Sequence, residues 1–548
     1  MTLRYQDILA GLRDAFPQPV SAPFHDSYVA HTVLRALDGL DDLKNDTPLL
    51  GHREDLDYDT ARATTLAEEG EPLEAVVAEL VSYFEGFTIW GHPHTQQNVI
   101  PPATIPSVVG MTLAHMYNPN IVSDEYSHRV AVAEVEVVAA CSSLLGYTPH
   151  QAGGLFTFGG TATNLYGVKV GLEKAQPGAM NTGTRDELVT FASDRSHYCR
   201  ITVAGWLGIG TDNSIAVPTN NRSEMDVGAL RSAMEQAISA GKKIAAVICT
   251  IGTTDAFGID DLEAVVRTRD ELVEKHSLSY KPHVHADAVS GWAWSVFNDY
   301  DFEANPLGFK PLTIRALSDA SHRIKALSMA DSVGVDFHKT GFTPYICSLI
   351  LFKDGRDLQL LGREPETMPM LYQHGDYHPG LYTLETSRMG GSALAALANL
   401  RLFGKQGWRA VLGHLIDLSQ HLREQLAGQP RIRVLNRESL GIVTLFRAYP
   451  DGVDTFDIEE RELSDPAMRE EVRAHNEYNR RVADYLHDRA MHGLGVAISR
   501  TEAYQETHYG EPVLALKSYL VSPFDDEASV ELVVQNVLQA RQALAQED

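Results

Sequence analysis

The sequence predicts an α/β fold with a mostly parallel sheet, a helical segment before it and a smaller α+β domain after it. Between about residues 130 and 355, short apolar runs rich in β-branched residues alternate with stretches of helical periodicity. Such alternation is typical of βαβ units, whose parallel strands are buried on both faces. The flanking regions lack it, so we expect three parts: 1–95, 96–404 and 405–548.

The N-terminal part is predicted to consist of helices and loops. One helix begins after Pro72, where apolar residues recur on a single helical face: Leu73, Val76, Val77, Leu80, Val81 and Phe84. This face needs a partner surface, which is either the body of the protein or a second subunit.

The large part is predicted to form the parallel sheet. Its expected strands are 188–191, 244–250, 284–286, 333–335 and 346–352, with a helix at 262–276. In the C-terminal part, the expected helices 408–426, 459–489 and 528–545 accompany strands at 442–446 and 515–521. This mixture predicts an α+β domain.

Composition excludes several classes of protein. Of 548 residues, 44% are hydrophobic and 22% are charged, which is too apolar for a disordered chain. The net charge of −27 argues against nucleic acid or an anionic membrane as the main partner. Four widely spaced cysteines without a CxxC pair predict neither a disulfide framework nor a metal site. We expect no membrane span and no signal peptide, and a cytoplasmic protein with reduced thiols.

The first chemical motif is the glycine-rich turn 159–164, which follows strand-like 155–158 and opens an expected helix at 165–175. Glycines let the backbone approach an anion, and a helix N-terminus supplies free N–H groups with a favourable dipole. The hydroxyls of Thr161 and Thr163 could add donors to a phosphate. A plain glycine-rich turn with a threonine cap is the alternative.

Two further motifs end predicted strands. Asp287 follows the strand 284–286 and lies at the carboxyl edge of the sheet, where ligands of α/β proteins bind. A charged aspartate buried there needs a cationic partner. His197 follows the strand 188–191, where its imidazole could stack on a flat ligand. The alternatives are a helix-capping aspartate and a histidine of an ordinary loop.

Lys339 lies in the fourth motif, 336–341, directly after the strand 333–335. A lysine at a strand end inside the fold becomes an amine nucleophile once burial lowers its pKa. A solvated surface lysine is the alternative for this residue taken alone.

The order of the four motifs indicates what they hold. A phosphate cup, a histidine, a strand-end aspartate and a strand-end lysine follow one another along one α/β body. A pyridoxal phosphate site needs these parts, because a carboxylate keeps the pyridine nitrogen protonated and a lysine binds the cofactor covalently. The sequence therefore predicts pyridoxal 5'-phosphate as the cofactor.

Several short segments between about residues 88 and 402 extend this pattern: Trp90-Gly91-His92, Gly252-Thr253-Thr254, Asp287-Ala288, His338-Lys339 and Gly341-Phe342-Thr343-Pro344-Tyr345. On these segments the sequence resembles the group II pyridoxal-phosphate decarboxylases, and among them most the bacterial tyrosine decarboxylases. The resemblance implies the aspartate-aminotransferase-like fold, fold type I. It also implies a homodimer in which the N-terminal segment clasps the partner.

The resemblance implies roles for individual residues. Lys339 corresponds to the cofactor-binding lysine, Asp287 to the partner of the pyridinium nitrogen, and His197 to the residue that stacks on the ring. Thr254 corresponds to a threonine that supports the aspartate, and His92 to a histidine of the substrate pocket. The remaining expected cofactor contacts are Thr161, Ala162, Thr163, Ala288 and His338.

The segment 362–379 corresponds to the mobile loop of the family. It is rich in Pro and Gly and has no helical or alternating period, which is typical of a lid. Tyr372 aligns with the catalytic tyrosine that returns a proton to the substrate, and Tyr377 is the alternative donor.

The implied activity is the decarboxylation of an L-amino acid, tyrosine or another aromatic one, to the amine and carbon dioxide. Two departures leave the substrate open: Asp-Phe-His-Lys replaces the usual Asp-Pro-His-Lys, and Ala-Val-Ser-Gly-Trp at 288–292 replaces Ala-Ala-Tyr-Gly-Gly. The alternatives are an acidic amino acid and another reaction of the cofactor, either retro-aldol cleavage or decarboxylating deamination. A non-catalytic binding protein would not need Lys339.

Overall fold

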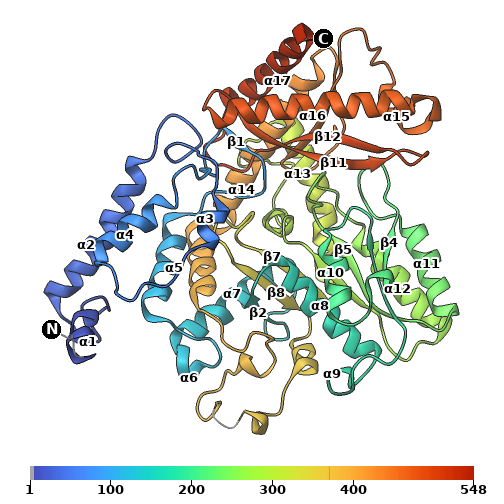
Figure 1. The fold of residues 1–548 in the computed structure, drawn as a ribbon. Coiled ribbons are helices and arrows are strands. Elements are labelled where there is room, and N and C mark those ends of the chain that lie inside the picture. The colour runs from blue at the N-terminus through green and yellow to red at the C-terminus, as the bar shows by residue number, and fades with distance from the viewer. Residues whose placement is uncertain (1–4, 369–370, 548) are drawn as a thin grey trace.

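The computed structural model describes residues 5–368 and 371–547, drawn in Figure 1. Its larger sheet contains β2 (Gly153–Thr157), β3 (Leu188–Ser193), β4 (Ser214–Val217), β5 (Lys243–Thr250), β6 (His283–Asp287), β7 (Ser332–Asp336) and β8 (Ser348–Phe352). The order across the sheet is β2-β8-β7-β6-β5-β3-β4. The strands from β7 to β4 run parallel, whereas β8 is antiparallel to both of its neighbours. The predicted, mostly parallel sheet is confirmed.

Helices pack against this sheet. The helices of the large part are α5 (Ile105–Tyr117), α6 (Asp124–Ser127), α7 (Arg129–Leu145), α8 (Gly160–Ala175), α9 (Ala179–Thr182), α10 (Cys199–Trp206), α11 (Val227–Ser239), α12 (Leu262–His276) and α13 (Pro311–Ile324). Helix α12 has the predicted bounds because Asp261 caps its first turn by accepting the N–H of Ala264. Helix α8 packs on β5, β6 and β7, so its first turn lies at the carboxyl ends of these strands.

The smaller sheet joins distant parts of the chain. Its strands are β1 (Thr95–Gln96), β9 (Ile432–Val434), β10 (Val443–Ala448), β11 (Ala497–Glu506) and β12 (Pro512–Tyr519), in the order β1-β11-β12-β10-β9. Strand β1 pairs in parallel with β11, so the end of the predicted N-terminal part completes the C-terminal sheet. The division at residues 95 and 404 stays a prediction.

Four helices complete the C-terminal region (Figure 1): α14 (Gly391–Ala427), α15 (Ile458–Ser464), α16 (Arg469–Met491) and α17 (Glu527–Glu547). Helix α14 is broken at Gly404, which has a φ of 51°. The prediction of one helix over 459–489 was wrong. Pro466 lies between α15 and α16, and a proline inside a helix removes a backbone hydrogen bond.

The N-terminal helices project from the body of the protein (Figure 1). They are α1 (Tyr5–Arg13), α2 (Pro23–Asp42), α3 (Tyr58–Arg62) and α4 (Leu73–Ser82), and α2 packs on α4. The predicted apolar face on α4 is only partly covered, because Val76, Leu80 and Phe84 are 39%, 58% and 41% exposed. Across the described ranges, no helix has the length and apolarity needed to cross a membrane.

Candidate active site

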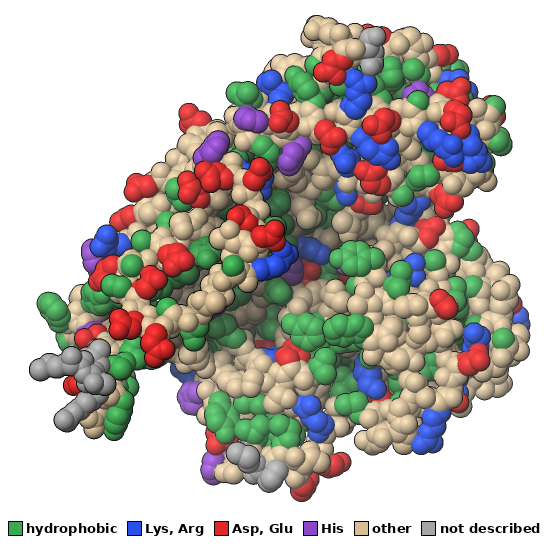
Figure 2. Space-filling model, viewed as in Figure 1, with side chains coloured by type: hydrophobic (Ala, Val, Ile, Leu, Met, Phe, Trp, Pro, Cys, Tyr) green, Lys and Arg blue, Asp and Glu red, His purple; other side chains and the backbone are tan. Residues whose placement is uncertain are grey.

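The predicted site residues gather at the carboxyl ends of the parallel strands. Asp287 ends β6, Lys339 follows β7, and His197 follows β3. Because these strands end at one edge of the sheet, the three side chains lie close enough for their charges to interact. Figure 2 shows that the surface is deeply hollowed between the large part, the N-terminal helices and the C-terminal region.

Asp287 is buried, and among the described residues only one of its two carboxylate oxygens has a hydrogen-bond partner. Its Oδ2 accepts a hydrogen bond of 3.0 Å from Nδ2 of Asn164 on α8. Its Oδ1 has no hydrogen-bond partner among the described residues. Burial raises the pKa of Asp287, whereas Asn164, Lys339 and His197 favour its ionised form. An unsatisfied buried oxygen is costly, so Oδ1 fits a donor supplied by a ligand, such as the N–H of a pyridinium ring.

Asp336, the last residue of β7, holds the amine of Lys339. Lys339 Nζ lies 3.1 Å from Asp336 Oδ2, and His338 Nε2 lies 3.4 Å from the same oxygen. Ser348 donates a 2.6 Å hydrogen bond to Oδ1, and Trp292 Nε1 donates to the Asp336 carbonyl at 3.1 Å. Both the carboxylate and the backbone of Asp336 are therefore fixed, and the lysine amine is oriented by a rigid acid.

The turn before α8 has the conformation of an anion cup. Gly159 has a φ of 128°, which glycine adopts readily, and α8 begins at Gly160. Ala162 already donates its N–H to the Gly159 carbonyl at 2.9 Å, and the buried Thr163 hydroxyl donates to the Gly160 carbonyl at 2.7 Å. The N–H groups of Gly160 and Thr161 have no acceptor within the helix. An anion at this turn would therefore meet these N–H groups and the exposed Thr161 side chain.

A side chain at Gly160 would also disturb the lysine. A Cβ atom there would come within 2.9 Å of Asp336 Oδ2 and 3.1 Å of a methyl carbon of Val289. The cup and the lysine amine are thus adjacent, on either side of Asp336.

His197 is half-buried at the edge of the site. Its Nδ1 accepts the N–H of Cys199 at 3.2 Å, so the neutral ring carries its proton on Nε2. Burial lowers the pKa of His197, an effect that Lys339 reinforces and Asp287 opposes. A neutral, oriented imidazole beside Asp287 and Lys339 suits a ring that stacks on a flat ligand.

The remaining predicted residues lie around this centre. Thr254 makes no hydrogen bond to Asp287 in the described ranges; its exposed side chain lines a small cavity, and its carbonyl accepts the Tyr519 hydroxyl at 2.6 Å. Ala288 is buried directly after Asp287. His92 is half-buried, and its Nδ1 accepts the N–H of His94 at 3.0 Å. Their predicted roles are not tested by these contacts.

The two tyrosines of the loop have different surroundings. Tyr377 donates its hydroxyl to Glu134 Oε1 at 2.9 Å, and the same oxygen accepts Arg388 Nη2 at 3.0 Å. Tyr372 lies edge-on to His378 at 5.4 Å between ring centroids, and its hydroxyl is buried without a hydrogen bond in the described part of the chain. Neither phenol is hydrogen-bonded to Lys339, so a role as proton donor requires the loop to move.

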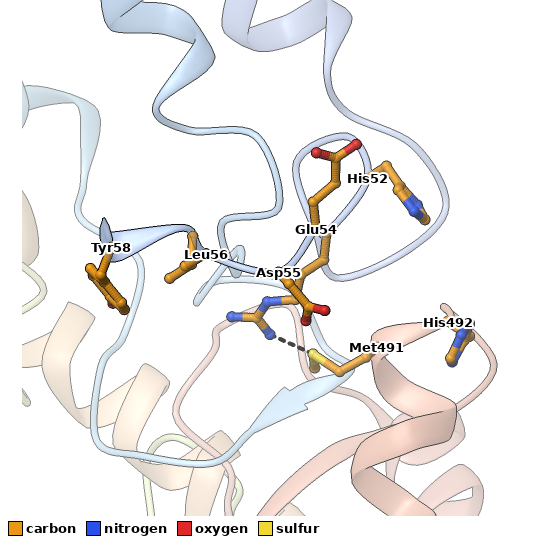
Figure 3. Close-up of a pocket in the computed structure, with 8 residues that line it drawn as sticks. His52, Glu54, Asp55, Leu56, Tyr58, Met491 and His492 are labelled. Atoms are coloured by element: carbon orange, nitrogen blue, oxygen red, sulfur yellow. Dashed lines mark hydrogen bonds between the residues drawn. The ribbon is translucent and has the colours of Figure 1, made fainter. Parts of the chain in front are cut away.

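A second hollow, of about 640 Å³, lies between the segment 52–58 and the end of α16 (Figure 3). Met491, the last residue of α16, and His492 after it line the hollow opposite this segment, and Arg53 Nη1 lies 2.6 Å from Met491 Sδ. None of the predicted site residues lines it. Among residues 5–368 and 371–547, no cluster of His, Cys, Asp and Glu side chains could hold a metal ion, the two histidines of this hollow included.

Two residues of the site were missed in the sequence analysis. Asn164 belongs to the glycine-rich motif but was given no role, and Asp336 opens the lysine motif but was also given none. Only Asp336 carried a usable signal, since a buried lysine needs an anion.

The family model "Pyridoxal-dependent decarboxylase conserved domain" matches residues 58–297. An L-2,4-diaminobutyrate decarboxylase of Acinetobacter baumannii is 26% identical over 66% of this chain and 68% of its own length. An L-tyrosine decarboxylase of Enterococcus faecalis is 24% identical over 61% of this chain and 62% of its own. The predicted likeness to tyrosine decarboxylases is confirmed, and diaminobutyrate decarboxylases share it.

A solved structure extends the match to nearly the whole chain. It is the glutamate decarboxylase domain of diaminobutyrate-pyruvate transaminase and L-2,4-diaminobutyrate decarboxylase from Vibrio parahaemolyticus, which is 19% identical with a TM-score of 0.74. The alignment covers 98% of this chain and 99% of the solved one. At 19% identity this match is evidence for the fold alone. The predicted fold type I is confirmed.

Proposed function

We propose that this pyridoxal-phosphate-dependent amino acid decarboxylase, a carboxy-lyase, acts on an aromatic L-amino acid such as tyrosine. The products are the corresponding amine and carbon dioxide. The observation that carries the substrate class is the uncharged wall of a small cavity, which is lined in part by Thr340, the residue after Lys339.

The cavity is small, about 10 Å³. Its lining includes Val99, Phe257, Ser290, Thr340, Ile442 and Tyr519, and none of the lining residues is charged. Lys517, whose Nζ lies 5.7 Å from the centre of the Tyr519 ring, is already paired with Asp255 at 2.7 Å. An acidic side chain would need a free cation here, because burying an unpaired charge is costly. A neutral aromatic side chain needs no charged partner at this wall.

The residues of the site have the chemistry to hold the cofactor, which when bound supplies an electron sink for the pair released with carbon dioxide. Asp287 would bind the ring nitrogen through its unsatisfied Oδ1, and the cup at Gly160 and Thr161 would bind the phosphate. Asp336 keeps the Lys339 amine in place when it is not bound to the cofactor. His197 would exclude water from one side of the cofactor ring and hold a neutral N–H on that side.

A second substrate class is favoured by one comparison. Diaminobutyrate decarboxylases match this chain at 26% identity, and such a substrate carries a side-chain ammonium group. A free carboxylate would then be needed near the wall, and Asp255 is the acid present, although Lys517 neutralises it.

The experiment is a substrate panel. The cofactor-loaded protein is incubated with L-tyrosine, L-tryptophan, L-phenylalanine, L-2,4-diaminobutyrate, L-aspartate and L-glutamate, and amine, carbon dioxide and ammonia are measured together. We expect the aromatic acids to give the highest kcat/KM, with amine and carbon dioxide in equal amounts and no ammonia. A kcat/KM for diaminobutyrate or an acidic substrate about tenfold above that of every aromatic one, a difference of ~1.4 kcal/mol, contradicts the proposal.

Tyr372→Phe is expected to reduce amine formation by about 10²-fold, because it removes a proposed general acid, and to let carbonyl product appear. Tyr377→Phe is the matched control, since it removes a loop phenol that is hydrogen-bonded to Glu134. It should lower stability by about 1 kcal/mol while amine formation persists. Product analysis and thermal unfolding of both variants decide between them. The reverse pattern, with turnover lost in Tyr377→Phe alone, assigns the proton to Tyr377.

We also propose that the protein is a cytoplasmic homodimer. All four cysteines are free and buried, and the N-terminal helices expose apolar side chains that include Ile8, Leu12, Leu37 and Leu80. An obligate interface buries roughly 2,000 Å² or more, so light scattering should give about twice the 60.3 kDa chain mass.

Leu80→Asp should weaken this dimer, because it places a charge on the exposed face of α4. Leu494→Asp is the control, since Leu494 is 60% exposed, like Leu80 at 58%, but lies after α16. A wild-type protein that is monomeric at micromolar concentration and fully active contradicts the dimer.

A further inference from the structure

Two buried histidines lie on the face of β6 that carries Asp287. His283 Nε2 lies 2.7 Å from Ser332 Oγ, and His285 Nδ1 lies 2.8 Å from the same oxygen. All three side chains are fully buried. Because alternate residues of a strand share a face, His283, His285 and Asp287 form one row beneath α8.

One face of α8 is matched to this row. Asn164 donates to Asp287, and Lys174 Nζ lies 3.3 Å from His283 Nδ1. Between them are two glycines that leave room for the rings: a Cβ at Gly167 would come within 2.5 Å of His285 Nδ1, and one at Gly171 within 2.8 Å of His283 Cβ. Residues 164, 167, 171 and 174 recur at helical spacing, so one helix face serves the whole row.

The hydrogen bonds of the row have a fixed direction. Burial lowers the pKa of both histidines to about 3, so each ring is neutral, with one donor and one acceptor nitrogen. An ammonium can only donate, and Lys174 is also held by Asp357 at 2.6 Å. His283 Nδ1 therefore accepts, and its Nε2–H donates to Ser332. The Ser332 hydroxyl then donates to His285 Nδ1, which leaves the His285 proton on Nε2.

The His285 ring extends along the sheet toward the site. His285 pairs in register with Ser332, and Asp287 pairs with Gly334. His285 Nε2 lies 3.6 Å from the position of a Cβ on Gly334, so the ring spans from the first pair to the second. In the described part of the chain, both His285 Nε2 and Asp287 Oδ1 are buried without a hydrogen-bond partner.

We propose that Lys174, His283, Ser332 and His285 form a polarised hydrogen-bond relay that directs the His285 Nε2–H toward Asp287 and stabilises its carboxylate. These are positioning residues, and the inference rests on the proposed role of Asp287. The relay begins at the Lys174–Asp357 ion pair, whose lysine is partly exposed on α8. Arg269 and Asp331, which also act on His283, pair with each other at 2.8 Å and need no part in the relay.

The direct test is the tautomer of each ring. Nitrogen NMR of the holoenzyme labelled with ¹⁵N-histidine should show His283 and His285 protonated on Nε2, with assignments from His283→Gln and His285→Gln. A His285 protonated on Nδ1 overturns the relay, whatever the activity. Lys174→Met should change the His283 signals. Lys169→Met should not, because Lys169 pairs with Glu173 on the same helix, outside the row.

A functional test separates positioning from packing. His285→Leu removes the hydrogen bond with Ser332 and the Nε2–H, whereas His285→Gln keeps an acceptor and a donor. We expect the leucine variant to bind pyridoxal phosphate about tenfold more weakly, judged by fluorescence titration, and the glutamine variant to stay near wild type. Equal binding in both variants overturns the proposal, as does equal weakening with an equal fall in unfolding temperature. If the leucine variant does not fold, the tautomers of the wild type still decide. A fully active Asp287→Asn together with the predicted tautomers would remove the role of Asp287 and leave the relay intact.

Discussion

Lys339→Ala is expected to reduce decarboxylation by about 10⁴-fold or more, the scale of loss when a covalent catalytic group is removed. The substitution also leaves the buried Asp336 without a cationic partner, because burial lowers the pKa of the neighbouring His338, and this is destabilising. Lys339→Arg is therefore the sharper variant, since it keeps a cation for Asp336 but cannot bind the cofactor covalently. Both variants should lose turnover, and the arginine variant should keep the unfolding temperature.

The measurement is borohydride reduction of the loaded wild type, followed by peptide mass mapping. The pyridoxyl group is expected on Lys339. Lys353→Ala is the control: Lys353 donates to the Ser328 carbonyl at 2.9 Å on the protein surface, so its loss should change neither turnover nor labelling. Label on Lys353, or on any lysine other than Lys339, contradicts the assignment.

Much of the fold could be predicted because buried parallel strands have a recognisable sequence. Residues 244–249 of β5 are an unbroken apolar run, and the expected strand 244–250 differs from β5 by one residue. β11 was not predicted, because its sequence contains Arg500, Glu502 and Glu506 and only three of its ten residues are buried. Its strand state depends on pairing with β12 and with β1, about 400 residues earlier in the chain, which no local pattern reveals.

The same difference between local sequence patterns and long-range contacts explains which residues of the site could be predicted. Asp287 and Lys339 could be predicted because each follows a strand and belongs to a motif whose residue types are rare at such places. Asn164 could not, because its role depends on where α8 lies over β6, a relation between segments 123 residues apart. The loop tyrosines are a further case. The sequence contains nothing that assigns Tyr377 a buried carboxylate partner 243 residues away.

Asp287→Asn is expected to lower kcat by about 10²–10³-fold, the scale of losing one preorganised electrostatic contact at a reacting centre. The amide has the shape of the carboxylate, and its oxygen can still accept the 3.0 Å hydrogen bond from Asn164. Its nitrogen then takes the place of Oδ1 and can donate to an unprotonated ring nitrogen. The cofactor should therefore be retained at saturating concentration while its absorbance changes, since the charge that keeps the ring protonated is gone.

Asp260→Asn provides the matched control for burial. Asp260 is also a fully buried aspartate of the large part, but its oxygens accept the backbone N–H groups of Met225 and Thr250, each at 2.7 Å. Placing a donor nitrogen beside these N–H groups should lower stability by about 1–3 kcal/mol. The kcat of the folded fraction should be unchanged. Asp287→Asn should show the opposite pattern, with kcat reduced and the unfolding temperature nearly kept. Near wild-type turnover in Asp287→Asn, measured with the cofactor bound, contradicts the role of Asp287 at the ring nitrogen and leaves its Oδ1 without a partner.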